Sequence, residues 1–87
     1  MFLHLGSDYV ISEKNIVGIF DIDTVSSHLT KSFFKACEKE GRVITVSNEL
    51  PKSVVLVKNE LGRMCYISQL SAATLKKRLG NFAGFNE

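Results

Sequence analysis

The sequence predicts a single α+β domain with a small, largely antiparallel sheet, in the order β-β-β-α-β-β-β-α. Two observations lead to this fold class. Short runs rich in Val, Ile and Phe alternate with turn residues, which is typical of strands. In two places the spacing of apolar residues changes to three or four, which is typical of helices. The length of 87 residues and the apolar content of 45% fit one globular domain over residues 1–87.

Three strands are expected first, at residues 2–5, 9–12 and 16–22, separated by the turns Gly6-Ser7-Asp8 and Glu13-Lys14-Asn15. The third strand is apolar on both faces, whereas a strand with one solvated face alternates apolar and polar residues. Something must therefore cover its second face. In a chain this short, we expect a second copy of the same chain to do so.

The first helix is expected over residues 26–40. Thr24 or one of the serines after it can cap the start, and Gly41 suits the position after the end. The apolar face has residues three or four apart, namely Val25, Leu29, Phe33, Ala36 and Cys37. Phe34 lies about 100° off this stripe, so it either widens the buried face or contacts a partner chain.

The second half is expected to hold strands at 42–47, 53–58 and 63–69 and a helix at 72–79. Ser71 can cap this helix and Gly80 can close it. Leu75 and Leu79 are four residues apart, so both should face the sheet. The run Val54-Val55-Leu56-Val57 again has no polar face.

Self-association is the expected consequence of two strands without a polar face, because the two predicted helices are short. The interface residues that we expect are Ile16, Ile19, Phe20, Phe34 and Val55. The tail 81–87, which carries two phenylalanines, is expected to be frayed or docked on a neighbouring copy.

The net charge of +2 is unevenly spread along the chain. Residues 1–50 hold five Lys/Arg and seven Asp/Glu. Residues 51–87 hold six Lys/Arg and two Asp/Glu. A basic second half is compatible with an anionic partner such as nucleic acid, although surface charge also serves solubility. No apolar run is long enough to span a bilayer, and the first residues lack the pattern of a signal peptide. We therefore expect a cytoplasmic protein with no membrane partner.

Few residues suggest catalysis or metal binding. Cys37 and Cys65 both lie in apolar contexts and are interpreted as buried thiols, since a disulfide is disfavoured in the cytosol. His4 and His28 are isolated, and no spacing resembles a metal site. We expect no metal, no cofactor and no small-molecule substrate.

One short motif matches an enzyme class. Asp21-Ile22-Asp23-Thr24-Val25 fits the D-x-D-x-[T/V] pattern of haloacid-dehalogenase-type phosphotransferases. That chemistry needs Mg²⁺, further motifs and a parallel α/β domain at least twice as large. A strand end next to a helix N-terminus, where carboxylates are favoured, accounts for the same residues. We therefore expect no catalytic residue and no enzymatic activity.

Three separated blocks of the chain resemble the RemA/RemB family of bacterial regulators of extracellular-matrix (biofilm) genes, in its RemB branch. They are His4–Asp21, Pro51–Val57 and Ser68–Leu79, in the family's order, and the resemblance covers about residues 1–79. It implies a cytoplasmic, non-enzymatic regulator. In the RemA branch, ring-like oligomers bind promoter DNA through repeated basic loops and bend it.

The resemblance also points to positions that would contact DNA. Lys14, Asn15 and Lys52 match the family's DNA-binding positions, and Lys76, Lys77 and Arg78 are added candidates. The chain departs from RemA at Glu49-Leu50-Pro51-Lys52-Ser53, where RemA has an arginine cluster, and at Asn15, where an arginine is expected. Both changes remove strong phosphate ligands.

Two functional hypotheses follow. The first is a homo-oligomeric regulator of matrix gene expression, with a ring as one candidate form, that binds DNA mainly through phosphate contacts. The alternative is a protein-interaction module that regulates through another protein without binding DNA. The sequence does not give the number of subunits, the target promoter or the sign of regulation.

Overall fold

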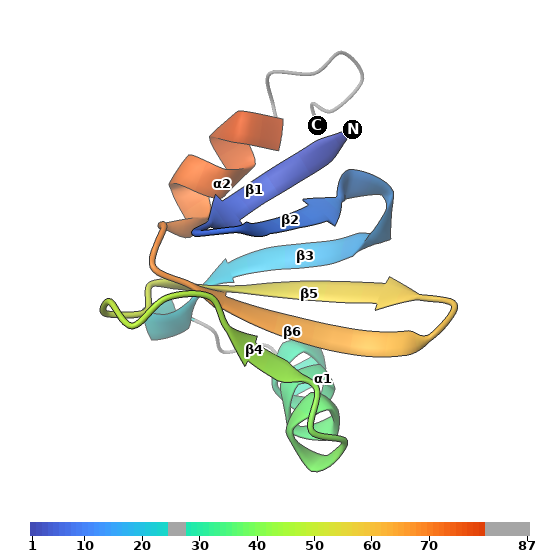
Figure 1. The fold of residues 1–87 in the computed structure, drawn as a ribbon. Coiled ribbons are helices and arrows are strands. Elements are labelled where there is room, and N and C mark those ends of the chain that lie inside the picture. The colour runs from blue at the N-terminus through green and yellow to red at the C-terminus, as the bar shows by residue number, and fades with distance from the viewer. Residues whose placement is uncertain (25–27, 80–87) are drawn as a thin grey trace.

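The computed structural model describes residues 1–24 and 28–79, and within them the predicted α+β order is confirmed (Figure 1). The strands are β1 (Phe2–Gly6), β2 (Tyr9–Ser12), β3 (Ile16–Asp21), β4 (Val43–Thr45), β5 (Ser53–Asn59) and β6 (Gly62–Ser68). The α-helices are α1 (His28–Lys39) and α2 (Ala72–Leu79), and short 3-10 helices lie at η1 (Glu13–Asn15) and η2 (Ile22–Thr24). The second helix matches its predicted bounds. The strand predicted at 42–47 is shorter, because only three residues of β4 pair with β6.

The strands form a four-stranded sheet in the order β3-β5-β6-β4 and a separate two-stranded sheet of β1 and β2. All pairs are antiparallel except β4 with β6. The parallel pair exists because α1 returns the chain to the same end of the sheet before β4 begins. The prediction of a largely antiparallel arrangement is therefore confirmed.

One face of the four-stranded sheet is covered by α2 and the β1–β2 hairpin. Leu75 and Leu79 of α2 are buried there, as predicted, together with Leu3 and Leu5 of β1. The strands contribute Ile19, Val55 and Val57 to the same cluster. This core joins the first and last described elements of the chain, and the hydroxyl of Ser68 donates to the carbonyl of Leu5 at 2.7 Å.

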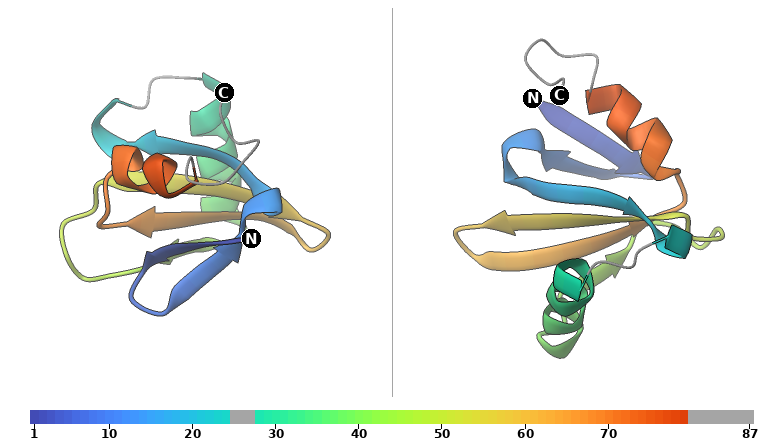
Figure 2. Two further views of the ribbon diagram at one scale, coloured as in Figure 1. Left: turned by 90° about the horizontal axis from the view of Figure 1, so that it is seen from above. Right: turned by 180° about the vertical axis from the view of Figure 1, so that it is seen from behind.

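The opposite face is covered by α1, which lies on the other side of the sheet from α2 (Figure 2). Phe33 and Phe34 pack with buried Cys37 against Val54 and Leu56 of β5. Phe34 therefore widens the buried face of the helix, which was one of its two predicted roles. The prediction for Leu29 is wrong: it is 79% exposed, because the helix turns Thr30 and not Leu29 toward the sheet.

The end of α1 forms as its sequence predicts. Gly41 has a φ of 69°, in the left-handed region that glycine adopts at low cost. The amide of Arg42 donates to the carbonyl of Cys37 at 2.8 Å, so the last carbonyls of the helix have partners. The predicted caps at Ser26 and Ser27, the apolar residue Val25, the closing residue Gly80 and the tail 81–87 lie outside the described residues.

The absence of a polar face on β5 has an explanation within one chain. Val55 and Val57 point to the core under α2, whereas Val54 and Leu56 point to the core under α1. The strand is the second of four and is buried from Ser53 to Val57. A second copy of the chain is therefore not needed to cover β5, and self-association stays a prediction.

Candidate nucleic-acid interface

The basic residues of α2 lie on its solvent-facing side. Leu75 and Leu79 turn into the core, and this orientation leaves Lys76, Lys77 and Arg78 exposed. The Nη1 atom of Arg78 donates to the carbonyl oxygen of His4 at 3.2 Å, which ties α2 to β1. A guanidinium has five N–H donors, so Arg78 has further donors for another acceptor beyond this one contact with the described residues.

Lys14 and Asn15 lie on η1, beside the turn that joins β5 to β6. They line a shallow pocket with Asn59, Glu60 and Leu61. Lys14 is exposed and Asn15 is half-buried. Glu60 places a negative charge beside Lys14 and Asn15, so the local charge is mixed.

Lys76 lies over β3. It lines a groove between α2 and β3 together with the residues from Ile16 to Ile19. Helix α2 starts at the end of β3 opposite to Lys14 and Asn15, because the amide of Ala72 donates to Asp21, the last residue of β3. The structure therefore does not group the basic residues of α2 with Lys14 and Asn15 at one end of β3.

Lys52 lies apart from Lys14 and Asn15. It precedes β5, and its carbonyl accepts from the amide of Ile22 at 3.0 Å. In the register of β3 with β5, Ile16 pairs with Val57, five residues along β5 from Lys52. At about 3.3 Å per residue, Lys52 is on the order of 17 Å from the other end of the strand. Within one chain, the predicted DNA-contacting residues therefore occupy both ends of the sheet.

Three further basic residues gather at the β5–β6 turn, and sequence reasoning missed them. Lys58 and Arg63 are direct partners in the β5–β6 register, and Arg42 donates to the carbonyl of Arg63 at 3.3 Å. Arg63 also pairs with the carboxylate of Glu40 at 3.2 Å and lies 5.9 Å from the ring centroid of Phe33. The hairpin register could have revealed the first pair. Glu40 offsets part of this positive charge.

The predicted interface residues fall into two groups. Ile19 and Val55 are 5% and 0% exposed and pack inside the chain, so they offer little surface to a partner. Ile16, Phe20 and Phe34 are half-buried and keep some accessible surface. Several other large apolar side chains are exposed, namely Phe2, Val10, Val17, Leu29, Leu50 and Leu61.

Asp21, the first residue of the phosphotransferase-like motif, has a structural contact. Its Oδ1 atom accepts a hydrogen bond from the amide of Ala72, the first residue of α2, at 3.3 Å. A carboxylate is favoured at this position because the helix dipole is positive there. Within residues 1–24 and 28–79, no three His, Cys, Asp or Glu side chains gather as a metal site would require.

The two cysteines lie together between α1 and β6. Cys37 and Cys65 are both free, both fully buried and members of one apolar cluster. Burial raises the pKa of the Cys65 thiol far above its ordinary value. A hydrogen bond with the Cys37 thiol is the second cause and raises this pKa further. A protonated thiol is a poor nucleophile, so this pair is suited to packing.

Comparisons with known proteins agree with the resemblance of the three sequence blocks. The model of the family described as RemA-like, extracellular matrix regulatory protein A-like, matches residues 2–79. The chain is also similar to a protein of Bacillus subtilis (strain 168) named extracellular matrix regulatory protein B. The two are 40% identical over 78 residues, which is 90% of this chain and 89% of the relative. In the described part of the chain, no helix is both long and apolar enough to cross a membrane. The chain therefore belongs to the RemA-like family of extracellular matrix regulatory proteins, on the side of its RemB-like members.

Proposed function

We propose that the protein regulates extracellular-matrix gene expression as a cytoplasmic homo-oligomer that binds DNA through phosphate contacts. Family membership supports the regulatory role. The observation that carries the DNA-binding part is the exposed basic run Lys76, Lys77 and Arg78 on α2, with Lys14 and Asn15 beside the β5–β6 turn as further candidates. Exposed Lys, Arg and Asn side chains on rigid elements are the usual phosphate ligands.

Assembly would make this arrangement more effective. One chain offers few phosphate ligands, and Lys52 lies at the other end of the sheet from Lys14. A row or ring of copies would repeat Lys14 and Lys52 along the assembled surface. Linked weak contacts raise the overall affinity steeply, which would offset the missing arginines at position 15 and in the turn 49–53.

A mobility-shift experiment with charge reversals tests this proposal. The probe is a promoter fragment of a matrix operon, with a scrambled fragment of equal length beside it. Lys76→Glu should weaken binding by about tenfold or more, since every copy in the oligomer loses a phosphate contact. Lys39→Glu is the matched control, because Lys39 is an exposed helical lysine on α1, on the other face of the sheet.

The outcomes separate the two hypotheses. A shift that the α2 variant weakens and Lys39→Glu does not supports direct binding. No shift at micromolar protein and low salt, together with retention of a partner protein in a pull-down, favours regulation through another protein. Equal loss in both variants would show that bulk charge, and not this surface, carries the binding.

A further inference from the structure

The sheet face under α1 is incompletely covered. The cross-strand row Gly18, Leu56, Cys65 and Val43 lies under the helix. The next row is Phe20, Val54, Ile67 and Thr45, and it extends past the side of the helix. A groove of about 390 Å³ opens there, a volume within the range of ligand-sized pockets.

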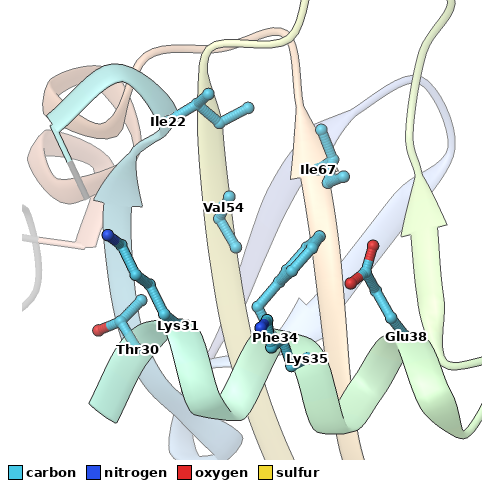
Figure 3. Close-up of a pocket in the computed structure, with 8 residues that line it drawn as sticks. All are labelled: Ile22, Thr30, Lys31, Phe34, Lys35, Glu38, Val54 and Ile67. Carbon is cyan, nitrogen blue, oxygen red and sulfur yellow. The ribbon is translucent and has the colours of Figure 1, made fainter. Parts of the chain in front are cut away.

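The groove has an apolar floor and a charged rim (Figure 3). Ile22, Val54 and Ile67 line it from the sheet side, and the Phe34 ring points into it from α1. Lys31, Lys35 and Glu38 line it along α1. An apolar slot with two lysines at its edge suits an aromatic segment that carries a negative charge.

The chain itself contains such a segment. The eight residues after Leu79 read Gly-Asn-Phe-Ala-Gly-Phe-Asn-Glu, in which Phe82 and Phe85 are the aromatic residues and Glu87 the charged one. In an extended chain, Phe82 and Phe85 would lie about 10 Å apart. Along α1, the seven steps from Lys31 to Glu38 span about 10.5 Å, so the length of the groove fits both rings.

The geometry of α2 favours the tail of another copy as the occupant. The tail begins at Leu79, on the face of the sheet opposite α1, and α2 ends at the end of the molecule that is remote from α1 (Figure 1). Eight residues reach at most about 28 Å. A tail entering the groove of its own chain would have to turn back around the sheet edge within that length, whereas the tail of a second copy would not.

We infer that residues 80–87 of one copy bind in the groove between α1 and the β5–β6 face of another copy, with Phe82 and Phe85 as anchors. The inference deepens the proposed self-association and rests on it. It is independent of DNA binding, because none of the proposed phosphate-contacting residues lines the groove.

A binding experiment with a tail peptide tests the groove. The probe is a fluorescent peptide with the sequence of residues 79–87, and the receptor is the full chain carrying Phe82→Ala/Phe85→Ala, whose own tail no longer competes. Saturable binding is expected, and a peptide with both phenylalanines replaced by alanine should bind more than about tenfold more weakly. Lys35→Glu in the receptor should weaken binding by about fivefold, and Lys39→Glu, which lies outside the groove, should not.

Light scattering on the full chain then identifies the donor of the tail. If a second copy donates it, Phe82→Ala/Phe85→Ala should lower the oligomer mass or move dissociation to higher protein concentration, while Asn81→Ala leaves both unchanged. A wild-type multimer whose mass survives the double substitution would overturn the inference and leave self-association standing. A wild-type monomer at tens of micromolar would overturn both. Failure of the peptide to bind, or equal binding by the Lys35→Glu and Lys39→Glu receptors, would also overturn the inference.

Discussion

At the scale of single residues, the contact between Cys37 and Cys65 is the result that the sequence least suggests. The two positions are 28 residues apart in the chain, and their separate patterns indicated only that each is buried. They meet because the short link after α1 places β4 beside β6. The amide of Arg42 donates to the Cys37 carbonyl, and the Cys65 amide donates to the Arg42 carbonyl at 3.0 Å.

The raised pKa of Cys65 makes stability depend on alkaline pH. In the unfolded chain this thiol ionises at its ordinary pKa of about 8.5, whereas in the folded chain it stays protonated at that pH. The unfolded state then binds fewer protons, so the free energy of unfolding should fall as pH rises above about 8.5. Tyr66 should also lower the free energy of unfolding at higher pH, because burial and the nearby Tyr9 raise its pKa in the folded chain.

Urea unfolding at pH 7, 9 and 10 under reducing conditions measures this effect. Cys65→Ala should be less stable than the wild type at pH 7, because it removes a buried sulfur, but its stability should fall less steeply with pH. Parallel pH dependences for the two proteins would contradict the assignment to Cys65.

At the scale of elements, β5 shows where sequence reasoning succeeded and where it stopped. Its lack of a polar face correctly indicated that both faces are covered. The pattern does not specify the cover, which here comes from α1 on one side and from α2 with β1 on the other. The hydrogen bond that ties β1 to the sheet joins Ser68 and Leu5, which are 63 positions apart, and local periodicity carries no information about such a contact.

The helices illustrate the same limit. Leu75 and Leu79 were placed correctly because α2 has a clear stripe four residues apart. For α1, the predicted apolar face includes Leu29, because leucine is apolar and lies four residues before Phe33. The structure buries Thr30, to 7% exposure, and exposes Leu29. How the candidate residues are distributed depends on tertiary packing: Lys14 and Asn15 lie beside the β5–β6 turn, and Lys52 lies at the other end of β5.

The start of α2 provides a test at this scale. Asp21→Ala removes the carboxylate that accepts from the Ala72 amide and should lower the free energy of unfolding by about 1 kcal/mol. Asp23→Ala is the matched control, because Asp23 is an exposed carboxylate two residues away. Chemical denaturation compares the variants. Equal stability of the two would show that the Asp21 contact contributes nothing.

At the scale of the whole molecule, the proposed DNA binding depends on repetition of a weakly basic surface. The net charge is only +2, so affinity must come from several copies acting together. The logarithm of the binding constant should then fall linearly with the logarithm of salt concentration, with a slope of about −0.9 for each phosphate contact. Titrations between low and moderate salt measure this slope, and Lys14→Glu should make it shallower. A binding constant that is insensitive to salt would exclude phosphate contacts as its main source.

The joining of β1 to α2 also determines when the chain can finish folding. The carbonyl of Leu5 accepts from Ser68, and the carbonyl of His4 accepts from Arg78. The partners in these two hydrogen bonds are 63 and 74 positions apart in the sequence. During synthesis, β1 and β2 leave the ribosome long before the helix that covers them exists. The α1 side of the sheet can form once β6 has emerged, but the other side must wait for residues 72–79. Contacts this distant in sequence slow folding, so the nascent chain exposes Leu3 and Leu5 until residues 72–79 have emerged.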